Sequence, residues 1–229
     1  MILMFASELM QTPQTNLDIA DGLVIARGTI GASISLAEIA RRVVPGSPIL
    51  AGRAPGLTAE GWYNTDKLAF AYGVHLALVA VDQETGAVSI ERYVIAQEVG
   101  RAVNPMLVKG QLLGGCLQGI GGALYEEFVY SETGDPLSAT LADYLLPTVC
   151  EMPRVEVVVS EDVPSPVNPL GLRGAGEGGI NGVGAALANA VEDALQRGGA
   201  ITRLPITPPD LLAQMKAWPA RANERSGTG

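Results

Sequence analysis

The stretch Leu170-Gly171-Leu172-Arg173-Gly174-Ala175-Gly176-Glu177-Gly178-Gly179 places one carboxylic acid among five glycines. A helix is predicted directly after it, over about 182–196. A helix N-terminus stabilises the anion of a nearby acid. Desolvation in an apolar pocket would instead raise the pKa of the Glu177 carboxyl, which suits a general base working near neutral pH. From these residues alone, an acid that only satisfies backbone N–H groups remains the stronger interpretation.

The same glycines formally satisfy the GxGxxG spacing of dinucleotide-binding loops, which follow a strand directly and open a helix. The strand predicted upstream ends at about Ser160, too far away. No acidic residue ends a second strand about 20 residues later, where Ile201 and Thr202 lie. These two mismatches argue against a stand-alone nucleotide-binding domain.

A second glycine-rich segment, over 107–127, reads as a long helix that contains six glycines. Each glycine inside a helix costs ~1 kcal/mol relative to alanine, so either burial holds this helix or it is broken. Gly110/Gly114 and Gly115/Gly119 have the GxxxG spacing of membrane helix pairs, but the polar residues among them argue against lipid. We expect a buried helix with another backbone or a ligand pressed close. Gln118 would be a buried amide in need of partners, which neighbouring backbone or a polar heterocycle could supply.

The remaining pattern predicts a mixed α+β fold in which antiparallel hairpins are more evident than βαβ units. Ser35 and Glu38 form a capping-box pattern that opens a short helix ending at Arg42. We predict one partial domain over 1–218 and a frayed tail over 219–229. The other predicted elements are a helix over 1–11, which reads as the second half of a helix, paired strands over 18–29, a loop over 46–66, strands over 74–81, 88–96, 154–160 and 204–207, and a helix over 209–218.

Composition excludes several classes of function. The chain has 15 basic and 24 acidic residues and no basic patch, so nucleic acid is not expected as a partner. No uninterrupted apolar run reaches the ~18 residues of a membrane span. Cys116, Cys150 and the single histidine, His75, have no metal-ligand spacing, which argues against a zinc site or an iron–sulfur cluster in this chain. Two cysteines without a disulfide framework fit a reducing compartment, and we expect a cytoplasmic location.

Four stretches together resemble the large subunit of the xanthine dehydrogenase / aldehyde oxidase / carbon monoxide dehydrogenase family, the molybdenum hydroxylases. Their order and approximate spacing are those of the family's C-terminal region. The resemblance implies an α+β molybdenum-cofactor-binding domain that is incomplete at its N-terminus. The four stretches are Tyr72-Gly73-Val74-His75; Val99-Gly100-Arg101-Ala102-Val103-Asn104-Pro105; Gly110-Gln111 through Gly121, with Ala123-Leu124-Tyr125-Glu126-Glu127 and Asp143-Tyr144-Leu145-Leu146-Pro147-Thr148; and Gly174-Ala175-Gly176-Glu177-Gly178-Gly179.

The resemblance also assigns roles. Glu177 matches the catalytic base near molybdenum, and Gln118, with Gly119, matches the contact to the pterin. Gly176 and Gly178 would allow close backbone approach beside them. No residue of this chain would bind the metal directly, because the dithiolene of the pterin holds it. The implied cofactor is molybdopterin with molybdenum, either as such or in its cytosine dinucleotide form.

The implied activity is hydroxylation of an aldehyde or N-heterocycle with oxygen derived from water, and electrons would leave through 2Fe-2S and FAD groups on partner chains. The family's large subunit is much longer, so a further chain would supply the rest of it. The expected partners are that chain, an iron–sulfur subunit, an FAD subunit and a small-molecule substrate. The alternative is a non-catalytic fragment or assembly scaffold of the same fold that lacks a complete cofactor site. Arg173 stands where the family often has lysine, which we interpret as structural, and Glu98 replaces a commoner aspartate.

Overall fold

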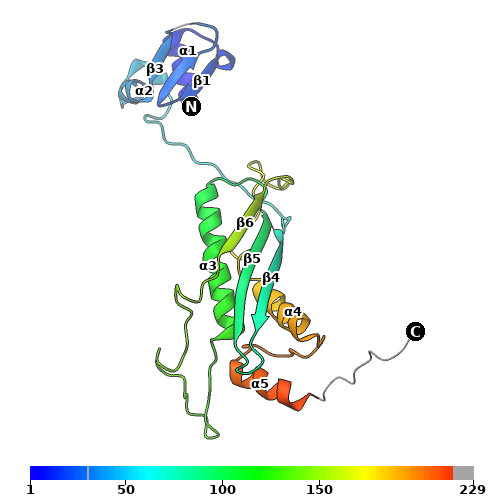
Figure 1. The fold of residues 1–229 in the computed structure, drawn as a ribbon. Coiled ribbons are helices and arrows are strands. Elements are labelled where there is room, and N and C mark those ends of the chain that lie inside the picture. The colour runs from blue at the N-terminus through cyan, green and yellow to red at the C-terminus, as the bar shows by residue number, and fades with distance from the viewer. Residues whose placement is uncertain (30, 219–229) are drawn as a thin grey trace, which may run out of the picture. The chain divides into compact units, whose positions relative to one another are not determined.

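The computed structural model describes residues 1–29 and 31–218. The chain divides into two compact units, Met1–Asn64 and a second unit that begins at Thr65 (Figure 1). Both units combine helices with a three-stranded sheet, so the predicted mixture of helix and strand is confirmed. The prediction of one domain over 1–218 stays a prediction, and the tail over 219–229 lies outside the described residues.

The first unit packs two helices and an antiparallel sheet around an apolar core. Phe5, Val24 and Ile39 are buried at its centre. The Ser35 hydroxyl accepts a hydrogen bond from the Glu38 backbone N–H at 3.1 Å, which confirms the predicted helix cap, while the Glu38 carboxylate accepts from Arg42. The elements are α1 (Ile2–Met10), β1 (Leu17–Ala20), β2 (Leu23–Ala26), β3 (Ser33–Ser35) and α2 (Leu36–Arg42), with 3₁₀ turns at Gln14–Asn16 and Pro48–Leu50.

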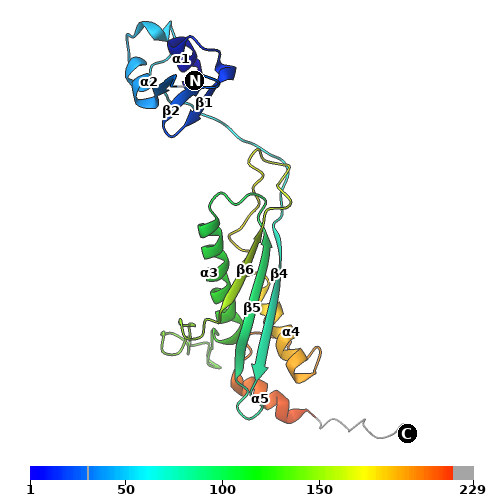
Figure 2. The ribbon, with the colours of Figure 1, turned by 45° about the horizontal axis from the view of Figure 1, so that its top comes forward.

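In the second unit the sheet has the order β4-β5-β6, and helices pack against one of its faces (Figure 2). The predicted hairpin forms between β4 and β5, whereas β6 runs parallel to β5 and is reached through α3. The unit therefore contains a parallel pair that the hairpin-dominated pattern did not indicate. Its elements are β4 (Tyr72–Val81), β5 (Val88–Glu98), α3 (Pro105–Leu124), β6 (Val155–Ser160), α4 (Val183–Leu195) and α5 (Pro208–Ala217).

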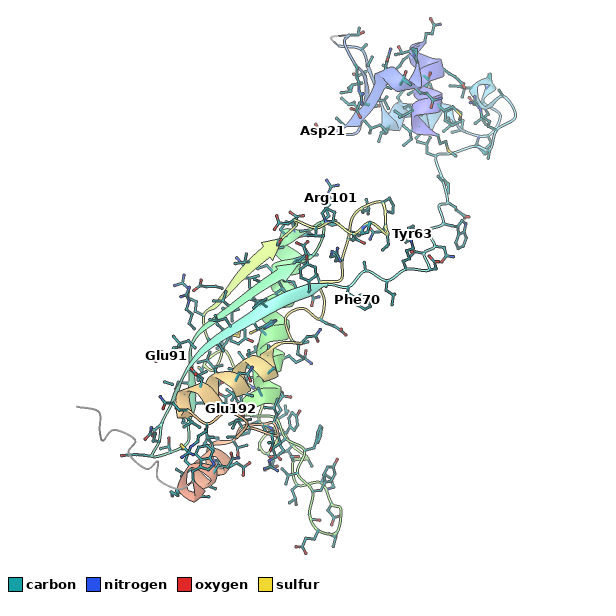
Figure 3. All side chains as sticks on the ribbon, turned by 90° about the vertical axis from the view of Figure 1, so that its right-hand side faces the viewer. Asp21, Tyr63, Phe70, Glu91, Arg101 and Glu192 are labelled. Atoms are coloured by element: carbon teal, nitrogen blue, oxygen red, sulfur yellow. The ribbon has the colours of Figure 1, made fainter. Side chains whose placement is uncertain are left out.

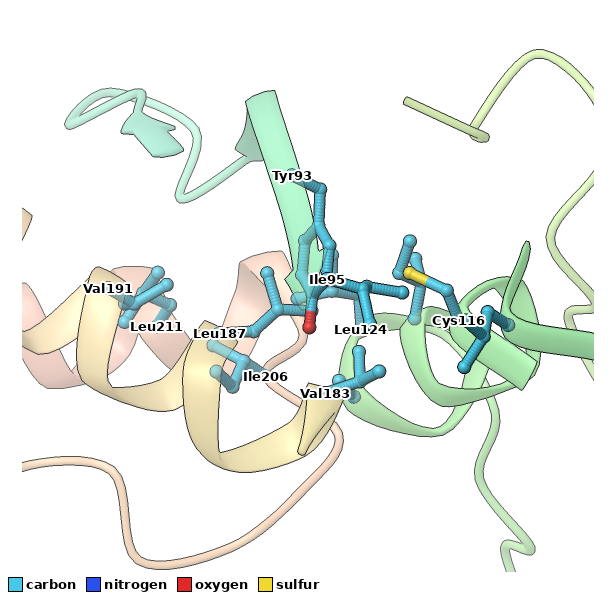
Figure 4. Close-up of a cluster of buried hydrophobic side chains, with 12 residues drawn as sticks. Tyr93, Ile95, Cys116, Leu124, Val183, Leu187, Val191, Ile206 and Leu211 are labelled. Carbon is cyan, nitrogen blue, oxygen red and sulfur yellow. The ribbon is translucent and has the colours of Figure 1, made fainter. Parts of the chain in front are cut away.

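The core of this unit lies between the sheet and the helices (Figure 4). Tyr93 and Ile95 of β5 meet Cys116 of α3 and Leu187 of α4, and all four side chains are fully buried. Burial raises the pKa of the Cys116 thiol to about 12, so the thiol stays protonated. The opposite face of the sheet is exposed and largely apolar. Its exposed apolar residues include Val74, Leu76 and Leu78 of β4 and Val158 of β6, and the exposed ion pair of Arg92 and Glu156 lies on the same face.

The glycine-rich helix α3 is continuous, and close packing explains two of its glycines. A Cβ on Gly115 would lie 3.1 Å from the backbone of Gly179, and one on Gly119 would lie 2.6 Å from Cβ of Val183. The helix therefore has another backbone pressed against it, as predicted. Gly110, Gly114 and Gly122 have open space where a side chain would begin.

One predicted strand is wrong. Residues 204–207 form no strand. Instead, the backbone N–H of Ile206 donates to the carbonyl of Ala123 near the end of α3, and the Ile206 side chain is buried. The segment thus finds a backbone hydrogen-bond partner at the end of a helix and does not pair with a strand. None of the helices within 1–29 and 31–218 is long and apolar enough to cross a membrane.

Candidate functional site

The glycine-rich loop that carries Glu177 is anchored to the end of β5. Arg101 N–H donates to the Gly171 carbonyl at 3.1 Å, and Arg173 N–H donates to the Val99 carbonyl at 2.9 Å. Gly100 sits between these bonds with φ +69°, and a Cβ there would lie 2.1 Å from the Gly171 oxygen. Only glycine fits this close, left-handed backbone without strain.

The carboxylate of Glu98 supports the same corner. Its oxygens accept hydrogen bonds from the Ser160 hydroxyl at 2.6 Å and from the backbone N–H of Gly100 at 2.7 Å and of Asp162 at 3.1 Å. The Ser160 hydroxyl and these N–H groups hold the pKa of Glu98 below its ordinary value. Glu98 is thus an ionised acceptor that joins β5, β6 and the start of the following loop.

Glu177 itself is exposed, and it lies in a turn before α4, not in the first turn of the helix. Its backbone carbonyl accepts from the N–H of Ile180 at 3.1 Å and of Asn181 at 3.2 Å, and α4 begins only at Val183. The predicted helix over about 182–196 is confirmed as α4, and Glu177 lies in the turn that precedes it. The carboxylate has no hydrogen-bond or ion-pair partner within the described part of the chain.

Two side chains from the sheet lie against this loop, and neither was singled out as a site residue from the sequence. His75 Nε2 lies 2.9 Å from the Gly178 carbonyl oxygen, and Nδ1 lies 2.9 Å from the Tyr93 hydroxyl. Gln97 is only 3% exposed, and its side chain occupies the space where a Cβ on Gly178 would sit. The alternation along β5 could have indicated Gln97, because it shares a face with the buried Tyr93 and Ile95.

A cavity of about 650 Å³ opens beside Glu177. Phe70, which lies just before β4 (Figure 3), and Tyr72 are the aromatic residues that line it. The polar groups that line it are His75, Gln97, Glu177 and Asn181, with glycine backbone at Gly73, Gly174, Gly176, Gly178 and Gly182.

Arg173 fixes the aromatic side of this cavity. Its guanidinium donates to the carbonyl of Phe70 at 2.7 Å and to the carbonyl of Val163 at 2.8 Å, and it lies 5.7 Å from the centre of the Tyr72 ring. These contacts agree with the structural interpretation of Arg173.

The structure does not bring every predicted site residue to one place. Gln118 is exposed on α3 and does not line the cavity, so the expectation of a buried amide is wrong. Gly176 lines the cavity with open space beside its Cα, whereas the space beside Gly178 is filled by Gln97 and that beside Gly119 by Val183. The elements that carry Gln118 and Glu177 are nevertheless in direct contact, through Gly115 and Gly179.

Residues 1–153 match the family of molybdopterin cofactor-binding domains. The chain belongs to this family. The match covers most of the described residues and includes α3 with Gln118. The predicted resemblance to part of a molybdenum hydroxylase large subunit is thereby confirmed, as is the predicted fold class.

Relatives with established names agree. The chain is 41% identical over 209 residues to the 6-hydroxypseudooxynicotine dehydrogenase complex subunit gamma of Paenarthrobacter nicotinovorans. This alignment covers 91% of the chain and 26% of the relative. The chain is 32% identical to the nicotine 6-hydroxylase large subunit of the same organism, covering 92% of this chain and 26% of the relative. The chain thus spans about a quarter of the length of these relatives.

Solved structures show the same fold. Quinoline 2-oxidoreductase from Pseudomonas putida 86 is 32% identical with a TM-score of 0.80, over 95% of this chain and 28% of that one. Carbon monoxide dehydrogenase from Oligotropha carboxidovorans is 26% identical with a TM-score of 0.83, over 94% of this chain and 26% of that one. Among the described residues, no group of three or more His, Cys, Asp and Glu side chains is placed to hold a metal ion.

Proposed function

We propose that this chain supplies the general base and part of the cofactor contact in a molybdenum hydroxylase that hydroxylates an N-heterocycle or an aldehyde. The observation that carries the proposal is Glu177. Its carboxylate has no partner within the described residues, and it lines a cavity on a loop whose backbone is bonded to the sheet on both sides of it. The names of two relatives, which include nicotine and quinoline, favour the N-heterocycle.

The residues present fit a molybdenum–pterin group. Gly174 and Gly176 have open space beside their Cα atoms, so a ligand can approach the backbone next to Glu177. The Gln118 amide is exposed on α3 and free to pair with a polar heterocycle. When bound, such a group accepts the two electrons of the oxidation and lowers the pKa of water.

The proposed roles of this chain's residues follow from their placement. Glu177 accepts a proton from water at its carboxylate, and the exposure of that carboxylate leaves it accessible to water and substrate. Phe70 and Tyr72 offer ring faces to a planar substrate and exclude water from one side of it. Gln118 orients the pterin through its amide, together with the backbone at Gly119, and Gly176 and Gly178 carry the backbone beside the acid.

The partners remain proposals of the same kind. We propose a chain that supplies the rest of the large subunit, a 2Fe-2S subunit and an FAD subunit, with the cofactor as molybdopterin or its cytosine dinucleotide form. The names of the relatives, a complex subunit gamma and a large subunit, support an assembly of several chains. The cytoplasmic location stays a prediction.

The experiment compares Glu177→Gln with the wild type in the assembly purified from its native host. Molybdenum content and turnover of nicotine, quinoline and benzaldehyde with an artificial electron acceptor are measured together. Turnover should be lost while molybdenum is retained. The matched control is Glu91→Gln, an exposed acid far along the sheet from Phe70 (Figure 3), which should behave as the wild type. Normal turnover by the Glu177→Gln assembly would support the scaffold alternative.

A further inference from the structure

We infer that His75 is a positioning residue for Glu177, acting through a hydrogen bond from its Nε2–H to the carbonyl of Gly178, with its Nδ1 held by the Tyr93 hydroxyl. This inference rests on the proposed role of Glu177 as the base. It concerns how a base on a glycine-rich loop is kept in one place. Glycines leave the backbone mobile, and a base misplaced by 1 Å can lose ~100-fold in rate.

His75 is the one described side chain that forms a hydrogen bond with residues 174–179. Its Nε2 lies 2.9 Å from the carbonyl oxygen of Gly178, the residue next to Glu177. The carboxylate of Glu177 has no such partner of its own within the described residues. The placement of the acid therefore depends on its backbone, and His75 connects that backbone to β4.

The hydrogen-bond partners determine the tautomer. A carbonyl oxygen can only accept, so Nε2 carries the proton that it donates to Gly178. In a neutral ring Nδ1 is then an acceptor, and the hydroxyl 2.9 Å away on Tyr93 is the donor. Tyr93 is fully buried, and desolvation raises the pKa of its phenol well above the ordinary value, which keeps that donor protonated.

Packing holds the ring in this orientation. A Cβ on Gly182 would lie 2.5 Å from Cδ2 of His75, so the imidazole rests directly on the backbone at the end of the turn that begins at Glu177. The rings of His75 and Tyr93 meet edge to face, with centroids 5.8 Å apart. One imidazole thus contacts the backbone both after Glu177 and just before α4, and it fixes the turn between them.

The first test uses the fact that His75 is the only histidine in the chain. A nitrogen NMR spectrum of the chain labelled with isotopic histidine contains one imidazole. The inference predicts a single fixed tautomer with the proton on Nε2, and a loss of that fixed tautomer in Tyr93→Phe. A proton on Nδ1, or rapid averaging of the two tautomers in the wild type, would overturn it.

The second test separates positioning from general stability. His75→Phe keeps a planar ring but cannot donate to Gly178, whereas the amide of His75→Gln can. In the assembled enzyme with nicotine or quinoline as substrate, His75→Phe should lower kcat by ~10–100-fold with KM nearly unchanged, and His75→Gln should recover most of that loss. Equal kcat in all three proteins would refute the role of His75.

Two further measurements keep the result interpretable. Amide hydrogen exchange of residues 174–182 should accelerate in His75→Phe while exchange of α3 stays unchanged, which a general loss of stability would not produce. If His75→Phe does not fold, the imidazole NMR spectra of the wild type and of Tyr93→Phe test the inference instead. Normal turnover by Glu177→Gln would reject the proposed base, whereas inactive Glu177→Gln beside fully active His75→Phe would reject only the positioning role.

Discussion

Replacing Gly119 with alanine tests the close packing that brings α3 against the start of α4. The new Cβ would lie 2.6 Å from Cβ and 2.7 Å from Cγ2 of Val183, which is fully buried. Carbon atoms pack comfortably at about 3.5–4.0 Å, so the elements must separate by ~1 Å. Overpacking of this kind costs ~1–3 kcal/mol. Alanine regains ~1 kcal/mol of helix propensity, so we expect a net loss of up to ~2 kcal/mol.

Gly122→Ala is the matched control, because it lies in the same helix with nothing within 4 Å of the new Cβ. It should gain up to ~1 kcal/mol. The two variants should therefore differ by ~1–3 kcal/mol, which corresponds to ~2–4 °C in Tm for each kcal/mol. Thermal unfolding followed by circular dichroism measures this difference. Adding Val183→Ala to Gly119→Ala should reduce the steric cost, and a Gly119→Ala protein that melts with or above Gly122→Ala would refute the packing argument.

Three other perturbations follow from the structure. Glu98→Gln should destabilise the chain near pH ~7, because the lowered pKa of Glu98 means that its ionised form favours the folded state. This contribution to stability is present above the ordinary pKa of 4.5 and disappears as the pH falls through the lowered pKa of the folded state. Urea unfolding should therefore show the stabilities of the two proteins converging in acid. Gly100→Ala should cost at least ~1–3 kcal/mol in the same assay, because a left-handed residue would also meet the Gly171 oxygen. Ser35→Ala should cost ~1 kcal/mol through loss of the helix cap, and Ser35→Asp should restore it.

Local signals in the sequence predicted most elements. The capping box at Ser35, the alternation along β4 and β5 and the amphipathic pattern of α4 each depend on neighbours within a few residues. The glycines of α3 also indicated a close approach, which Gly115 and Gly119 confirm. The segment 204–207, wrongly predicted as a strand, instead donates a backbone hydrogen bond to Ala123 of α3, far away in the sequence.

The candidate site was predictable only where a motif is contiguous. Glu177 stands within its motif, but His75 lies 103 residues from Gly178 and had no signal of its own beyond being the sole histidine. The only signal for Gln97 was its place in the alternation along β5, which puts it on the same face as the buried Tyr93 and Ile95. The exposure of Gln118 depends on which side of α3 faces α4, and a helix with glycines on several sides does not reveal that side.

The outer face of the second unit's sheet has a consequence for producing the chain in isolation. Val74, Leu76 and Leu78 leave more than half of their surface in solvent, and among the described residues neither β4 nor β6 has a further strand beside it. An apolar face between two open strand edges is a template for strand addition. Self-association that rises with protein concentration is therefore the expected behaviour of the chain by itself, and synthesis together with a covering partner is the natural way to suppress it.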